Sequence, residues 1–218
     1  AIADDPLCFM SNVEFLDKNN IEAPTSWNDL LDPVYKDMIQ FADARTSGTA
    51  VTRIFSILEV NDRDEDAAFE YMKKLKASVQ VYTKSGGGGT IPVGLGQAGS
   101  GIFFIVDALK TQQAGYDVAI SFPKEGIGSA AEGIGIIKGA KHPGLAKQLI
   151  DWATTDQMQK YFADYKINFI PTYPGVETQP TLTEALESAE RIFPIDSEYT
   201  GENRERIVEK WINLVLQD

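Results

Sequence analysis

Two short segments combine the residue types that bind an anion through neutral donors. The sequence RTSGTA and the later sequence TKSGGGGT each follow a short strand pattern. Hydroxyls and open backbone amides in such loops can donate to phosphate oxygens, and glycine lets a ligand approach the backbone closely. The candidate ligand-binding residues of these segments are Thr46, Ser47, Gly48, Thr49, Ser85, Gly86 and Gly87. For either loop alone, a helix cap or a tight turn is an equal alternative.

Neither loop matches a nucleotide-binding motif. A Walker A loop needs a Lys-Ser/Thr pair after its last glycine, and no glycine of this chain is followed by one. The segment GLGQAG resembles a dinucleotide fingerprint, but it precedes an apolar strand instead of following one. We therefore expect no nucleotide cofactor, and no other cofactor is indicated.

Catalytic and metal sites have few candidate residues. The chain has one cysteine, Cys8, and one histidine, His142, so it has no internal disulfide and no site that needs two imidazoles. An enzyme acting on a phosphorylated substrate remains an alternative function. It lacks a base and nucleophile pair, because the one imidazole lies far along the chain from the glycine loops.

The overall charge excludes two classes of partner. The formal net charge is -12 and the sequence pI is about 4.6, which does not suit a nucleic-acid backbone or an anionic membrane surface. Apolar residues make up 43% of the chain, enough for a core, but no run is long enough to span a membrane.

The apolar patterns alternate between strands and helices, which predicts an α/β fold with a partly parallel sheet. Strands are expected near residues 38–44, 79–83, 101–106 and 117–122, and the apolar start of the chain also reads as a strand. Helices are expected near residues 50–58, 65–76 and 107–114, and the chain after Pro123 is glycine-rich and then mainly helical.

Three sequence blocks, residues 23–50, 75–104 and 117–165, occur in an order that resembles the substrate-binding proteins of ABC importers. They are most similar to the type 2 branch that includes ferric-ion, phosphonate and sugar-phosphate binders. This resemblance implies two α/β lobes joined by a hinge, with ligand trapped as the lobes close. Residues 12–116 are then the second lobe, and residues 117–218 are the hinge return strand and the C-terminal part of the first lobe.

The resemblance also implies that the N-terminal part of the first lobe would precede Ala1, so that the first lobe of this chain is incomplete. Exposed apolar helix faces, such as those carrying Trp152 and Trp211, are then expected to cause self-association. The implied partners are a small anionic solute and the transmembrane subunits of an ABC permease. The implied location is periplasmic or extracellular, with a lipoprotein anchor in a Gram-positive cell.

The resemblance places two carboxylates where sugar-phosphate binders accept hydrogen bonds from hydroxyls, at Asp107 and Glu125. A helix cap and a turn carboxylate are their respective alternatives. Ferric-ion relatives use neighbouring tyrosines where this chain has Phe103 and Phe104, which cannot bind a metal. We expect a non-catalytic protein that binds a phosphonate or a sugar phosphate. The alternatives are a ferric-ion, polyamine or carboxylate binder of the same fold, or the binding half of a receptor.

Overall fold

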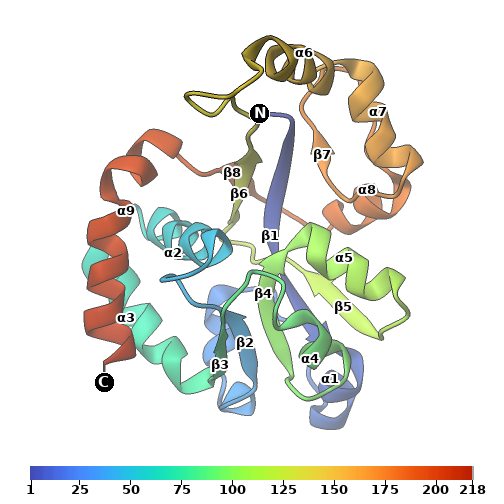
Figure 1. The fold of residues 1–218 in the computed structure, drawn as a ribbon. Helices are drawn as coiled ribbons and strands as arrows, with labels where there is room; N and C mark the ends of the chain where they lie inside the picture. The colour runs from blue at the N-terminus through green and yellow to red at the C-terminus, as the bar shows by residue number, and fades with distance from the viewer. Residues whose placement is uncertain (218) are drawn as a thin grey trace.

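The computed structural model describes residues 1–217 as a mixed sheet with helices packed around it (Figure 1). The strands are β1 (Ala3–Asn12), β2 (Ile39–Ala42), β3 (Val79–Thr83), β4 (Ser100–Phe104), β5 (Val118–Ser121), β6 (Ile127–Glu132), β7 (Ile170–Pro171) and β8 (Ile192–Pro194). The helices are α1 (Val13–Asn19), α2 (Gly48–Val60), α3 (Glu65–Leu75), α4 (Thr90–Gly94), α5 (Ile105–Gln113), α6 (Pro143–Ala153), α7 (Asp156–Asp164), α8 (Pro180–Leu186) and α9 (Ser197–Trp211). Short 3-10 turns cover Trp27–Leu31, Pro33–Tyr35 and Lys76–Ser78, and a π turn at Ile212–Leu216 extends α9.

Strand β1 connects the two parts of the sheet. Its first residues pair with β6 and β7, as in Pro6 with Ser129, and its later residues pair with β4 and β5, as in Leu7 with Phe104. At about 3.3 Å per residue, a strand of 10 residues is long enough to belong to both parts. The chain crosses a second time between β5 and β6 (Figure 1). The predicted α/β fold and the N-terminal strand are confirmed.

The lower part of Figure 1 contains the parallel strands that position the candidate loops. Strand β2 pairs in parallel with both β3 and β4, so the carboxyl ends of these strands share one edge. All four residues of β2 are buried, as its continuous apolar pattern indicates. Helix α2 follows β2 and is buried along most of its length, because it lies between the sheet and α9 and also contacts β6.

The C-terminal helix differs from its predicted place. Helix α9 runs back along α3 on the left of Figure 1, where Arg206 and Lys210 contact Glu65, so residues 197–216 pack against the residues that were predicted to form the second lobe. Trp211 is correspondingly buried and lies 5.4 Å from the ring of Tyr82. The expectation that Trp211 is exposed is therefore wrong. Its apolar spacing indicated a buried face but not the surface that covers it.

Helix α6, in the upper part of Figure 1, carries a row of exposed apolar side chains. Leu145, Leu149 and Trp152 follow one another along one face of α6, and Trp152 is 48% exposed. This part of the expectation agrees with the structure. Self-association through this face stays a prediction.

The pairing of Glu65 with Arg206 and Lys210 provides a stability test. Hydrogen bonds from these two side chains lower the pKa of Glu65 from 4.5 to about 2. A lowered native pKa stabilises the fold above pH 4.5, and this contribution is lost as the pH falls from 4.5 towards 2. Because Arg206 is half exposed, we expect Glu65→Gln to lower the free energy of unfolding by about 1 kcal/mol at pH 7 in urea denaturation.

The difference in unfolding free energy between the unchanged protein and Glu65→Gln should shrink as the pH is lowered from 4.5 towards 2. Glu14→Gln is the matched control, because Glu14 pairs with Lys18 and both side chains are 70% exposed. It should change stability much less than Glu65→Gln does, because solvent screens an exposed pair. Equal effects of the two substitutions at pH 7 would contradict the assigned packing of α9.

Candidate functional site

An open cleft of about 460 Å³ lies where the loops after β2 and β3 meet the hinge strands. Its walls come from the β2–α2 loop, the β3–α4 loop, the end of β4 and the end of β6. The lining residues are Thr46, Ser47, Gly48, Thr49, Thr52, Lys84, Ser85, Gly86, Phe104, Ala130 and Glu132. The cleft therefore brings together the two loops that the sequence analysis selected.

The amino end of α2 is open to this cleft. Ser47 is the N-cap residue, and its side chain makes no capping hydrogen bond. The first backbone bond into the helix runs from the amide of Val51 to the carbonyl of Ser47. The amides of Gly48, Thr49 and Ala50 have no partner within residues 1–217. A 13-residue helix with open amides and an unused hydroxyl at its amino end suits an anion.

The loop before α2 is fixed by Asp43. The carbonyl of Asp43 accepts hydrogen bonds from the amides of Thr46 and Ser47, and its carboxylate binds the side chain and amide of Arg45. The hydroxyl of Thr46 donates to the carbonyl of Lys84 at 2.8 Å, which ties this loop to the glycine loop. Thr46 is thus a connection between the two loops, and its hydroxyl is already used.

The glycines allow the second loop to lie against two helices. A Cβ atom on Gly86 would lie 2.1 Å from Oγ1 of Thr49, and one on Gly87 would lie 2.9 Å from the carboxylate of Asp107. A side chain at either position would require the loop, or the side chain of Thr49 or Asp107, to move. The glycine run is therefore a close-packed loop beside the amino end of α2, and it is not a linker between lobes.

One carboxylate, that of Glu132, lines the cleft, and two further carboxyl groups lie close to it. Asp107 is in the first turn of α5, Glu132 ends β6, and Asp5 lies in β1 beside the point where it changes partners. Burial raises the pKa of Asp5 to about 8, and the nearby charges of Glu132 and Asp107 add to this rise. Burial also raises the pKa of Asp107. The cleft is thus lined by hydroxyls and open amides from the two loops, by the cation Lys84 and by one carboxylate, Glu132.

Glu125 is not brought to this cleft. Its carboxylate accepts hydrogen bonds from the hydroxyl of Ser26 and from the amide of Trp27, at the start of a 3-10 turn. The Arg191 side chain binds the carbonyl of the same residue at 2.9 Å. The turn-carboxylate alternative describes this arrangement, in which Glu125 holds the β5–β6 crossing against the turn that begins at Trp27.

The lining residues that the sequence analysis did not select are Thr52, Lys84, Phe104, Ala130 and Glu132, and it also missed Asp5, which lies close to Glu132. Asp5 is a buried carboxyl group in an apolar strand, and Glu132 is an isolated acid among alanines and glycines. Both are unusual in their local sequence, which was the available signal. Their approach to the glycine loop depends on β1 and β6 crossing beside it, which no local pattern reveals.

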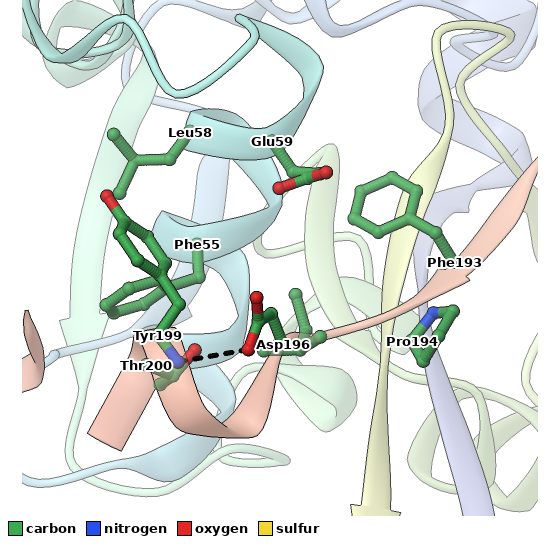
Figure 2. Close-up of a pocket in the computed structure, with 9 residues that line it drawn as sticks. Phe55, Leu58, Glu59, Phe193, Pro194, Asp196, Tyr199 and Thr200 are labelled. Carbon is green, nitrogen blue, oxygen red and sulfur yellow. Dashed lines mark hydrogen bonds between the residues drawn. The ribbon is translucent and has the colours of Figure 1, made fainter. Parts of the chain in front are cut away.

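A second, nearly closed cavity lies between α2, β8 and α9 (Figure 2). Its lining includes the rings of Phe55, Phe193 and Tyr199, and the amide of Tyr199 donates to Asp196. Its volume is about 10 Å³, which is room for at most one water molecule and none for a solute. It is a packing gap where the returning α9 covers α2.

Similar proteins have been solved with the same fold. The periplasmic binding protein AfuA from Actinobacillus pleuropneumoniae, with fructose-6-phosphate bound, is 31% identical and has a TM-score of 0.88. The match covers 100% of this chain and 68% of AfuA. The periplasmic binding protein P5PA is 29% identical with a TM-score of 0.87, covering 98% of this chain and 68% of P5PA. Apo ferric ion-binding protein A from Pasteurella haemolytica, at 16% identity and a TM-score of 0.75, shares the fold.

A sequence relative matches most of the chain. An uncharacterized protein of Haemophilus influenzae is 32% identical over 213 residues, which is 96% of this chain and 60% of that relative. Within residues 1–217, no helix has the length and apolar character needed to cross a bilayer. The family model for bacterial extracellular solute-binding proteins matches residues 1–203. The chain belongs to this family, and its fold is that of the type 2 periplasmic binding proteins.

Proposed function

We propose that this chain is the solute-binding part of an ABC importer component that captures a sugar phosphate or a phosphonate in the cleft beside α2. The observation that carries the proposal is the set of unpartnered amides at Gly48, Thr49 and Ala50, which open into the cleft beside the hydroxyls of Ser47 and Thr49. These groups are suited to the oxygens of a phosphoryl or phosphonyl group.

The carboxyl groups favour a polyhydroxylated solute. Glu132 lines the cleft, and Asp107 lies against Gly87 on its border. Carboxylates accept hydrogen bonds from sugar hydroxyls and repel a second phosphate, so one solute would place its phosphate at α2 and its hydroxyls towards β6. The similarity to AfuA, which was solved with fructose-6-phosphate bound, supports this class.

The proposed role is non-catalytic, with delivery to permease subunits outside the cytoplasm. The family supports solute binding as the role of the chain. Because the chain spans 60% of the Haemophilus influenzae relative, delivery and location are proposed for the full-length protein. The solute would be captured when the two lobes close about the segments that connect them, which are β1 and the stretch between β5 and β6.

Titration calorimetry of the full-length protein tests the solute class. We expect fructose 6-phosphate to bind more tightly than inorganic phosphate and than fructose, because only the ester offers both a phosphate and hydroxyls. A ligand at one hundred times its Kd should stabilise the fold by about 2.7 kcal/mol, which thermal denaturation detects. Ferric citrate, spermidine and an alkylphosphonate are titrated in the same way. Binding of iron or spermidine without binding of any phosphorus compound would reject the proposal.

Two substitutions should separate the two sides of the cleft. Thr49→Val removes one hydroxyl beside Gly86. It should weaken the binding of inorganic phosphate and of fructose 6-phosphate about tenfold, because a hydrogen bond to a charged group is lost. Glu132→Gln should weaken the binding of fructose 6-phosphate. It should leave the binding of inorganic phosphate unchanged or slightly tighter, because a negative charge is removed. Calorimetry with both ligands measures each effect.

Thr111→Val is the matched control for the threonine substitution. Thr111 is buried, but its hydroxyl donates to the carbonyl of Asp107 within α5 and does not line the cleft. It should leave both affinities unchanged. Loss of phosphate binding in Glu132→Gln, with no loss in Thr49→Val, would mean that the phosphate lies at the other side.

A further inference from the structure

Arg53 is a buried cation behind the loop that presents the open amides. Its side chain belongs to α2, one helical turn after Thr49, and only 2% of the residue is exposed. Side chains on a helix lean towards its amino end, and the Arg53 guanidinium accordingly donates to the carbonyl of Ala42 at 3.0 Å. Ala42 is the last residue of β2, where the loop to α2 begins. The charge is thus buried close to the amino end of α2.

No carboxylate forms an ion pair with this guanidinium. Within residues 1–217, no Asp or Glu oxygen lies within 4.0 Å of its nitrogens. The nearest acid along the loop, Asp43, has its carboxylate oxygens bound to Arg45 at distances of 2.6 to 3.1 Å. A buried charge without a counter-ion is costly, so such a residue needs a compensating negative charge.

The surroundings of Arg53 compensate its charge only in part. Its guanidinium lies 3.7 Å from the ring centroid of Phe41, a cation–π contact. The titratable groups that act on it are Tyr82, Asp43 and Tyr71, and the ring of Trp211 packs on Tyr82. Burial lowers the pKa of Arg53 to about 10, so the side chain remains charged at neutral pH. Because the surrounding side chains exclude water, the charge of the guanidinium is screened less and its electrostatic field reaches farther.

We propose that Arg53 is a charge-compensating residue of the cleft, whose buried guanidinium stabilises a dianionic phosphoryl group at the amino end of α2 without touching it. The inference rests on the proposed function and deepens it, because it makes the cleft selective for the dianion. The lining residue Lys84 is also a cation, but it is exposed, so water and salt screen its charge more than that of the buried Arg53. The field of a buried cation acts in proportion to ligand charge.

The second ionisation of bound fructose 6-phosphate, followed by phosphorus NMR across pH, is the direct readout. The free phosphate ester has this pKa near 6. In the unchanged full-length protein we expect the bound ester to have a pKa lower by about one unit, which corresponds to about tenfold tighter binding of the dianion. Arg53→Gln keeps a donor for the Ala42 carbonyl and should return the pKa of the bound ester towards that of the free ester. Arg53→Lys should retain the lowered pKa.

Lys18→Gln is the control for net charge, because Lys18 is exposed and its substitution removes the same charge far from the cleft. It should leave the pKa of the bound ester unchanged. A bound ester with the same pKa in the unchanged protein and in Arg53→Gln overturns this inference alone and leaves Arg53 a packing residue. Absence of any bound phosphorus signal overturns the proposed function together with this inference. If Arg53→Gln does not fold, an unshifted pKa in the unchanged protein is sufficient to overturn the inference.

Discussion

The cleft depends on the amino end of α2 being left without partners. A helix begins with amides that need acceptors, and most helices satisfy one with a side chain from the N-cap residue. Here the Ser47 side chain makes no such bond, whereas Asp64, Thr155 and Asp196 cap their own helices in this way. Helices α4, α5, α6 and α8 also lack a cap from the N-cap side chain, but α2 is the long, buried helix whose open end lines the cleft. The sequence has a serine at the N-cap position, and its hydroxyl could accept a hydrogen bond from a first-turn amide. In the structure it makes no such bond. The arrangement gains a preorganised set of donors at the cost of local stability.

The rest of the fold keeps that helix end in place. The hydroxyl of Thr46 joins the loop before α2 to the glycine loop, and Gly86 permits contact with Thr49. Farther along α2, the hydroxyl of Ser56 accepts a hydrogen bond from the amide of Gly128 in β6. The helix that presents the amides is therefore bonded to one of the two crossing segments.

Local sequence predicted the parts of the site that are local. The loops at Ser47–Thr49 and Ser85–Gly87 were identified because small residues between a strand and a helix have few roles, and parallel strands place such loops at one edge. The structure brings both to one cleft. Glu125 and Glu132 are only seven positions apart, yet the first caps a turn and the second lines the cleft. Their separation depends on where β6 begins, a boundary that composition does not define.

Long-range packing was the part that the sequence could not predict. The apolar face of α9 indicated burial, but its placement on α3 depends on Glu65 and Tyr82, which lie more than a hundred residues earlier. The burial of Asp5 likewise depends on β6 and α5 meeting β1. The glycine run was ambiguous for the same reason. Its meaning became clear only when Thr49 and Asp107 were found against Gly86 and Gly87.

The most direct test of the account is an amide NMR titration of the full-length protein with fructose 6-phosphate. The central claim is that the phosphate binds at the open end of α2 against the glycine loop. It predicts that the amide signals of Gly48, Thr49 and Ala50, with those of Gly86 and Gly87, show the largest ligand-induced shifts and saturate together. Saturable binding that leaves these five amides unshifted, while amides elsewhere respond, would contradict it.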